Sequence, residues 1–271
     1  MILSTGGAAI ALAVPLWLAL AAALAYGFAG LAPAARTRLS AAALACAWGL
    51  HLMLLGLDIG GFNAATGGAR LGFGPVLSLT VWLVIAVHAV ESRFVPLPSV
   101  RRALSLAGVA AVLLALLFPG ESMRFASSWA PLHLVLGIGS YGLFGAAVLH
   151  AAMLDAAERR LRQRDAGAAA PGMPLLQLER LTFRFVDAGF VVLTAALLLG
   201  VLTLPAWRWD HKTVFSLLGW AVFALLLAGR HLRGWRGRRA TRWLYAGALL
   251  LLLAYVGSRF VFEVVLGRHS T

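Results

Sequence analysis

The stretch FVDAGFVVLTAALLLGVLTLPAWRWDHKTVFSLLGWAVFALLLAG, residues 185–229, contains two long apolar runs separated by a short polar segment. Each run is about as long as a helix must be to cross the roughly 30 Å hydrocarbon layer of a bilayer. Lipid offers the backbone no hydrogen-bond partners, so such runs must be helical. The stretch therefore predicts two transmembrane helices joined by a tryptophan-rich loop at residues 205–212.

The same alternation of apolar runs and polar clusters continues in both directions along the chain of 271 residues, of which 61% are hydrophobic and 12% charged. This composition excludes a soluble domain, which needs far more polar surface. The sequence predicts an all-α polytopic membrane protein, in which residues 1–271 form a single transmembrane domain. The eight predicted helices are Ala8–Leu31, Leu39–Leu57, Phe73–Val90, Ala103–Phe118, Leu132–Leu154, Phe185–Leu204, Thr213–Gly229 and Trp243–Phe262.

The longest connection, at residues 155–184, divides five earlier helices from three later ones. It begins as a charged helical extension, passes through a Gly/Ala/Pro-rich patch, and ends in an amphipathic segment from Leu175 that we expect on the membrane surface. Cys46 is the only cysteine, which excludes an intrachain disulfide and a thiolate metal cluster. Any metal site must therefore use nitrogen or oxygen ligands.

Basic residues are distributed unequally between the two sides of the predicted membrane protein. One side holds 17 of the 23: Arg36, Arg38, Arg93, Arg101, Arg102, Arg159, Arg160, Arg162, Arg164, Arg180, Arg184, Arg230, Arg233, Arg236, Arg238, Arg239 and Arg242. Because basic loops are retained in the cytoplasm, this pattern predicts a multi-pass membrane protein with both termini outside. Topology and contact with anionic lipid account for the net charge of +13, so no nucleic-acid partner is predicted.

Three histidines from distant parts of the chain, His133, His211 and His269, fall on the predicted outer face. Haem suits such a surface, because its iron takes two axial ligands, often imidazoles, and its flat ring lies against aromatic groups. The tryptophans predicted at this face are Trp129, Trp207 and Trp209. The sequence thus predicts a haem platform on the outer face, with Asp210 and Lys212 placed to orient a ligand or meet the propionates.

Simpler interpretations exist for each of these residues. Tryptophans at a membrane boundary commonly act as interfacial anchors, and Arg208 and Lys212 can extend to lipid phosphates. Asp210 is a favoured residue type for capping the helix that follows it. These alternatives explain the residues one at a time, but they do not explain why the residues gather on one face.

The remaining histidines lie in the predicted helices or at their inner ends. His88 and His150 are near the inner boundary, where an interfacial role competes with a second iron or proton site. His231 lies among arginines and is given no specific role. His51 is deeper in the membrane, where it can face an interior cavity or bond to a neighbouring helix.

The segment WRWDHKTVFSLLGWAVFALLLAGR, residues 207–230, resembles the tryptophan-rich loop and following helix of the cytochrome c assembly superfamily, in its CcsA/HemX/YpjD-type branch. LERLTFRFVDAGFVVLTAALLLG at 178–200 resembles the preceding helix, and PLHLVLGIGSYGLFGAAVLHAAML at 131–154 resembles the helix that opens with an external histidine. The resemblance implies a core at residues 131–271. It also implies that His133 and His269 are axial haem ligands flanking the loop. The resemblance further implies that the chain lies in a bacterial inner membrane and delivers or otherwise handles haem in company with other assembly proteins.

The chain also departs from the pattern of that family. His211 and Thr213 stand where many members have proline and glutamate, and Ala228 stands where cytochrome c synthases have an intramembrane histidine. We therefore expect haem binding or handling by an assembly factor that is not an enzyme in the strict sense.

Two other functions remain open on the sequence alone. The departures would also suit a scaffold or regulatory membrane partner that has lost haem. A transporter of small solutes or ions would need charged groups near the middle of the membrane, where only His51 is at intermediate depth.

Overall fold

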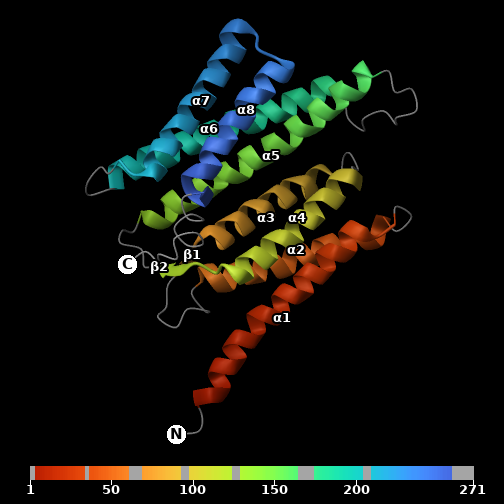
Figure 1. Cartoon of the computed structure of the whole chain (residues 1–271), viewed down its shortest axis with the longest axis vertical. Helices are drawn as coiled ribbons and strands as arrows, with labels where there is room; N and C mark the ends of the chain where they lie inside the picture. Colours follow the sequence, from red (N-terminus) through yellow and green to blue (C-terminus); the bar gives the residue numbers. More distant parts are fainter. Residues whose placement is uncertain are drawn as a thin grey trace. The chain divides into compact units, whose positions relative to one another are not determined.

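Eight long helices make up most of the structure, a computed structural model that describes residues 4–33, 37–60, 69–92, 98–123, 129–163, 174–203 and 209–257. Within these residues each of the eight is long and apolar enough to cross a membrane, which confirms the predicted all-α membrane class. The helices fall into two compact units, with α1 to α4 in unit 1 and α5 to α8 in unit 2 (Figure 1). The single domain at residues 1–271 stays a prediction, and the described part of the predicted core at 131–271 lies in unit 2.

Unit 1 is a group of four helices with one short pair of strands. Its elements are α1 (Ser4–Leu31), α2 (Thr37–Ile59), β1 (Ala69–Leu71), α3 (Phe73–Glu91), α4 (Pro98–Leu117) and β2 (Glu121–Met123). α1 packs along α2 and α4, and α3 packs along α4. β1 and β2 pair antiparallel with Arg70 opposite Ser122, a pairing that the sequence did not predict.

Two contacts fix α3 to its neighbours in unit 1. Such contacts matter because lipid provides no hydrophobic driving force between helices. Trp48 and Trp82 stack at 4.5 Å between ring centroids, and each indole N–H donates to the carbonyl of the other residue, at 3.2 and 3.0 Å. Gly74 lies directly against α4, where an added Cβ would be 2.5 Å from the carbonyl oxygen of Phe118. α3 is thus fixed to α2 by polar side chains and to α4 by close backbone approach.

Unit 2 consists of four helices and a short π-helix. Its elements are α5 (Ala130–Arg162), α6 (Leu175–Thr203), α7 (His211–Arg233), α8 (Gly237–Leu252) and η2 (Leu253–Gly257). α5 lies along α6, and α7 packs against α8 (Figure 1). Gly234, with φ 63°, ends α7 in the left-handed conformation that glycine adopts most readily, and so starts the turn into α8.

The core of unit 2 is built on two stacked phenylalanines. Phe144 of α5 and Phe223 of α7 lie 3.9 Å apart between ring centroids and are almost completely buried. Each ring rests on a glycine of another helix: an added Cβ would be 3.0 Å from Phe144 at Gly189 and 2.8 Å from Phe223 at Gly247. Small residues therefore bring all four helices of this unit within reach of one aromatic pair.

The helix boundaries differ from prediction mainly at polar ends. α5 continues to Arg162, eight residues beyond the predicted end at Leu154, and α6 begins at Leu175 as one continuous helix. The segment that we expected on the membrane surface is thus the first part of α6. Two acidic residues of these extensions are paired within the unit: Asp155 accepts from Thr241 and Tyr245 of α8, and Glu179 pairs with Arg230 of α7 at 3.1 Å.

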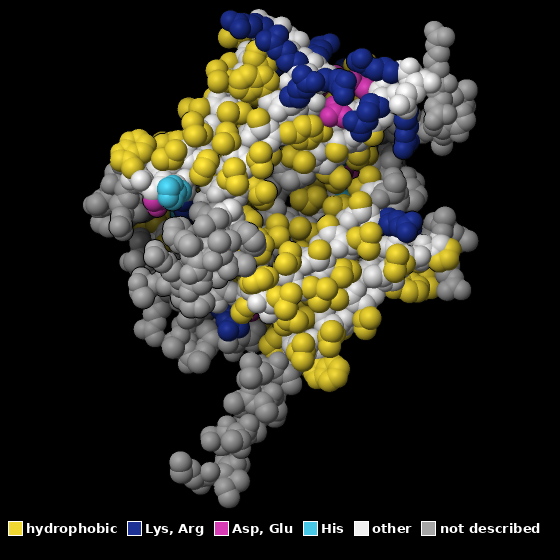
Figure 2. Space-filling model, viewed as in Figure 1, with side chains coloured by type: hydrophobic (Ala, Val, Ile, Leu, Met, Phe, Trp, Pro, Cys, Tyr) yellow, Lys and Arg dark blue, Asp and Glu magenta, His cyan; other side chains and the backbone are white. Residues whose placement is uncertain are grey.

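Lys and Arg side chains gather at the end of unit 2 where α5 ends, α6 begins and α7 turns into α8 (Figure 2). The described residues of this basic end are Arg159, Arg160, Arg162, Arg180, Arg184, Arg230, Arg233, Arg236, Arg238, Arg239 and Arg242. The sides of the helices between the two ends are covered mainly by hydrophobic side chains (Figure 2). This arrangement suits helices that are surrounded by lipid.

Candidate haem site at the His133 end of unit 2

His133 lies in the first turn of α5, where the chain enters the helix through Pro131. Its backbone N–H bonds to the carbonyl of Trp129 at 3.0 Å, and its half-buried ring turns toward the last turns of α6. There the ring nitrogen Nδ1 is 2.9 Å from the carbonyl oxygen of Ala196. The side chain predicted as an axial ligand is thus fixed by the neighbouring helix.

This hydrogen bond determines which nitrogen of His133 carries the proton. A carbonyl oxygen can only accept, so Nδ1 must be the N–H donor. In a neutral imidazole the other nitrogen, Nε2, then presents its lone pair. A backbone carbonyl that holds Nδ1–H is a common arrangement behind metal-ligating histidines, because it sets the ring orientation and raises the basicity of Nε2. The residue therefore fits a ligand to iron through Nε2.

Gly200 of α6 makes room for this ring. A Cβ at this position would be 3.0 Å from Cε1 and 3.4 Å from Nδ1 of His133. Glycine within an apolar helix weakens the helix by about 1 kcal/mol relative to alanine, so its presence often has a packing reason. Here the absence of a side chain lets the imidazole reach the carbonyl of Ala196.

Asp210 caps α7, as one of the simpler interpretations predicted. Its carboxylate oxygen Oδ1 accepts a hydrogen bond of 2.8 Å from the backbone N–H of Thr213. His211 and Lys212 therefore occupy the first turn of the helix. Because the first turn carries unpaired backbone N–H groups and the positive end of the helix dipole, it attracts anions.

Lys212 connects the start of α7 with the π-helix. Its ammonium nitrogen lies 5.1 Å from the centroid of the Tyr255 ring. Just before η2, the carbonyl of Leu251 accepts a hydrogen bond from the hydroxyl of Tyr141. α5, α6, α7 and η2 thus meet at this end of unit 2, and π-helices of this kind are frequent at functional sites.

The tryptophans and His211 at this end have large accessible surfaces. The exposed fraction is 57% for Trp129 and 74% for Trp209, and His211 is also exposed. Exposed indoles suit both an aromatic platform and an interfacial anchor. Trp207 and His269, the other predicted members of the site, lie outside the described residues.

The helices that flank the tryptophan-rich loop are tied together below it by residues on which the family resemblance rests. Trp220 of α7 donates from its indole N–H to the hydroxyl of Thr194 at 2.9 Å, and Thr194 donates to the carbonyl of Phe190 at 2.7 Å. The rings of Phe190 and Trp220 stack at 5.6 Å. This bond fixes α6 against α7 and therefore sets the spacing of the two ends of the loop.

The other histidines are placed apart from this site. His88 is buried in unit 1 and His150 is buried in unit 2, where its Nδ1 is 2.7 Å from the carbonyl of Ala146. His231 is exposed at the basic end. His51 of unit 1 lines a cavity and also bonds to α1 and α3, so both of the roles that the sequence left as alternatives are present. In the part of the chain that the structure describes, no group of three His, Cys, Asp or Glu residues can hold a metal ion.

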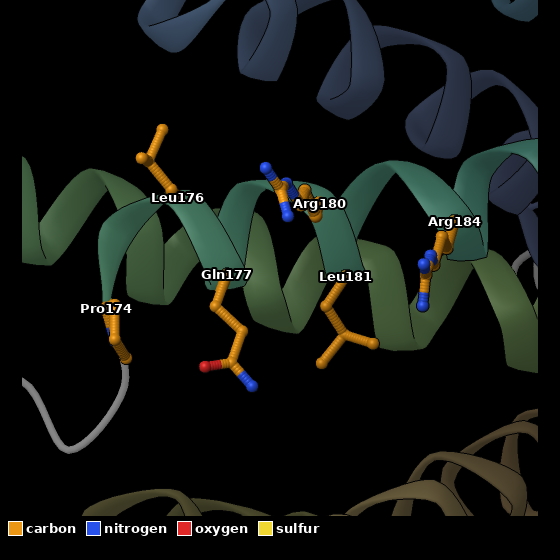
Figure 3. Close-up of a pocket in the computed structure, with 6 residues that line it drawn as sticks. All are labelled: Pro174, Leu176, Gln177, Arg180, Leu181 and Arg184. Atoms are coloured by element: carbon orange, nitrogen blue, oxygen red, sulfur yellow. The ribbon is translucent and has the colours of Figure 1, made fainter.

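A pocket of 490 Å³ lies at the opposite end of α6, about 20 residues or roughly 30 Å from the His133 contact. Its residues are Pro174, Leu176, Gln177, Arg180, Leu181 and Arg184 (Figure 3). Gln177 and Leu181 point to one side of the helix and Leu176 to the other (Figure 3). The long basic side chains here suit lipid phosphates, and the pocket contributes nothing to the candidate haem site.

The sequence predicted His133, Asp210 and Lys212 as members of the site but gave no indication of most of the groups that surround them. Nothing in the sequence indicated that the carbonyl of Ala196 would bond His133, or that Tyr255 would lie beneath Lys212. The glycine at position 200, inside an apolar helix, was the one available signal of a close contact.

Comparison with known proteins identifies the family of the chain. Residues 16–266 match the family model described as cytochrome C assembly protein. The inner membrane protein YpjD of Escherichia coli strain K12 is 31% identical over 200 residues, which cover 72% of this chain and 75% of YpjD. The cytochrome c biogenesis protein CcsA of Prochlorococcus marinus strain MIT 9303 is 33% identical over 99 residues, which cover 35% of this chain and 30% of CcsA. No solved structure matches the chain.

These matches agree with the resemblance in the tryptophan-rich loop and its flanking helices. The family model extends across both units, and the eight long apolar helices make the chain a multi-pass membrane protein in contact with the lipid bilayer. The chain belongs to the cytochrome c assembly protein family.

Proposed function

We propose that the chain is a haem-binding protein of a bacterial inner membrane that holds haem for cytochrome c assembly. The observation that carries the proposal is the hydrogen bond of 2.9 Å between Nδ1 of His133 and the carbonyl of Ala196, because it leaves Nε2 available to iron. A c-type cytochrome must acquire haem before it functions, so a family that assembles these proteins has a use for such a ligand.

His133 and His269 are the proposed axial ligands, and the three tryptophans form the surface against which the ring lies. Lys212 and the first turn of α7 attract the anionic propionates, while Asp210 holds that turn in place. His211, exposed beside them, is a further candidate for contact with the ligand. A bound haem would supply an iron centre, and His133 and His269 would hold it.

The first prediction is that His133→Ala abolishes stoichiometric haem binding. The wild type, His133→Ala, His269→Ala and the double variant are each expressed with haem in excess and purified in mild detergent. Their haem content is then measured by absorption spectroscopy. Added imidazole should restore the haem spectrum of His133→Ala, because the small base replaces the lost ligand.

His231→Ala is the matched control. His231 also holds its Nδ1 2.8 Å from a backbone carbonyl, that of Leu227, but it lies at the basic end of unit 2. This variant should keep full haem content. A haem-free wild-type protein, or a double variant with unchanged haem, contradicts the proposal; complementation of a deletion by the double variant would then favour the scaffold function.

A further inference from the structure

Unit 1 contains a buried chain of three polar side chains that the haem proposal does not use. The hydroxyl of Tyr26 is 3.1 Å from Nδ1 of His51, and Nε2 of His51 is 2.6 Å from the hydroxyl of Ser78. The three residues come from α1, α2 and α3, lie within membrane-spanning segments and are each at most 1% exposed. Their hydrogen bonds therefore form away from water, where an unmet polar group is costly.

Counting protons shows that these three hydrogen-bonded side chains have one donor in excess. Tyr26, neutral His51 and Ser78 carry one proton each that can be donated, but only two hydrogen bonds join them. If Nδ1 of His51 carried the proton, the surplus donor would be Tyr26, which is completely buried and has no other partner among the described residues. The favoured arrangement is therefore Tyr26 donating to Nδ1, Nε2–H donating to Ser78, and the Ser78 hydroxyl donating elsewhere.

Ser78 and His51 line a cavity of 220 Å³, whereas Tyr26 does not. The apolar part of the wall is formed by Pro15, Ala19, Leu54, Leu55, Val112, Ala115, Leu116 and Pro119. The described structure gives the Ser78 hydroxyl no acceptor beyond His51, which already donates to it in this arrangement. The surplus donor of the three side chains is thus the Ser78 hydroxyl, which lies on the cavity wall.

Charged residues line the cavity nearer the end of α2. Asp58 lies seven residues after His51, or about 10 Å along the helix, and Arg70 belongs to β1. Their charges are opposite and cancel, so the cavity has no net charge to attract an ion. Its interior combines apolar walls with a neutral hydrogen-bond donor, and its volume is below the roughly 300 Å³ at which sites for drug-sized ligands begin.

We propose that this cavity binds a small neutral molecule of the membrane through a carbonyl oxygen that accepts a hydrogen bond from Ser78. A carbonyl satisfies the surplus donor without needing a donor site in return, since both nitrogens of His51 are already engaged. An ion is excluded by the cost of placing an unpaired charge among the apolar walls. The site is independent of His133 and of the proposed haem function, and it is built entirely within unit 1.

A matched pair of probes tests the proposal: acetophenone, and 2-phenylpropene, which has the same shape with a methylene group in place of the carbonyl oxygen. Binding of each to the purified full-length protein in detergent is measured by equilibrium dialysis. Ser78→Ala should bind acetophenone about 2- to 12-fold more weakly than the wild type, which is the effect of losing one hydrogen bond. Its affinity for 2-phenylpropene should equal that of the wild type. Comparing variants with one probe cancels the partition of that probe into detergent.

Infrared spectroscopy with acetophenone labelled at the carbonyl carbon provides a second readout. The carbonyl stretch should move to lower frequency on binding to the wild type and should lose this shift in Ser78→Ala. Ser105→Ala is the control, because Ser105 is also a completely buried serine of unit 1 but does not line the cavity. It should leave both the affinity and the shift unchanged.

Two outcomes overturn the proposal. Equal effects of Ser78→Ala on the two probes would mean that the carbonyl makes no bond to Ser78, and that the cavity, with room for roughly seven water molecules, is filled by water. Binding of acetophenone that survives filling of the cavity by Ala19→Leu would mean that the probe binds elsewhere.

Discussion

At the scale of single residues, the candidate haem site depends on what surrounds His133 more than on His133 itself. A histidine near a helix end is ordinary, but one whose Nδ1 is bonded to a carbonyl of the next helix has a fixed tautomer and a fixed ring plane. Gly200 is the residue that permits this, because the imidazole lies against the position that a Cβ would occupy there. The sequence predicted His133 as a ligand, and the structure shows how its side chain is oriented.

Gly200→Ala should therefore weaken haem binding while leaving the fold intact. The new Cβ would lie 3.0 Å from Cε1 of His133, so the ring must shift and its bond to Ala196 must lengthen. Losing a group that orients a metal ligand typically costs about 10- to 100-fold in affinity. Haem titration measures this loss, and circular dichroism checks the helix content.

Gly139→Ala on α5 is the control for Gly200→Ala, since its Cβ would meet only Val192 at an ordinary 3.9 Å. This variant should bind haem as the wild type does. Equal haem affinity of the Gly200→Ala, Gly139→Ala and wild-type proteins would show that the contact with α6 does not orient an iron ligand.

At the scale of helices, the apolar runs and the charge clusters predicted the presence of each helix correctly, but they predicted the helix ends less accurately. All eight predicted helices are present in the described residues, because a run of apolar residues in lipid has no alternative to helix. The predicted membrane spans stopped at Leu154 and began at Phe185, and the charged extension after Leu154 and the amphipathic segment from Leu175 are continuous with α5 and α6. Asp155 and Glu179 continue the helices, because Tyr245 and Arg230 of neighbouring helices pair with them.

Such pairings cannot be read from one segment, because the partner lies 51 to 90 residues away. The same reason explains why the stack of Phe144 on Phe223 was not predicted: each residue alone is one of many apolar side chains. The glycines were the one signal of this packing that the sequence contained. Gly189 and Gly247 interrupt good helix-forming runs, and the structure places an aromatic ring on each.

Gly247→Ala should consequently destabilise unit 2. The added Cβ would lie 2.8 Å from Cζ of Phe223, a ring with no exposed surface that is also stacked on Phe144. Overpacking of this kind costs about 1 to 3 kcal/mol, which exceeds the gain of roughly 1 kcal/mol in helix propensity only when the ring cannot move. We expect a net loss, measured as a lower midpoint of thermal unfolding in detergent.

Gly137→Ala provides the comparison for this prediction, because Gly137 lies within α5 of the same unit and an added Cβ there meets nothing within 4 Å. It should keep or raise the midpoint. A Gly247→Ala protein as stable as Gly137→Ala would mean that Phe223 shifts without cost and that the stack does not determine the packing of α7 on α8.

At the scale of the whole molecule, the distribution of charge links the fold to the proposed function. In unit 2 the basic side chains gather at one end, while His133, Asp210 and Lys212 lie where α5 and α7 begin (Figures 1 and 2). Because basic loops are retained in the cytoplasm, the haem site is proposed to face outward. The orientation of the chain is therefore a separate and testable part of the proposal.

Cysteine labelling can determine this orientation, because the chain has a single cysteine. In a Cys46→Ser background, Trp209→Cys is placed before α7 and Arg236→Cys at the α7–α8 junction; both positions are exposed. A membrane-impermeant maleimide added to cells with a permeable outer membrane should label Trp209→Cys at once and Arg236→Cys only after the inner membrane is disrupted. The unsubstituted background reports nonspecific labelling. The opposite pattern would place the His133 end in the cytoplasm, and a haem site there could receive haem directly from the cytoplasm but could not present it outside without a further carrier.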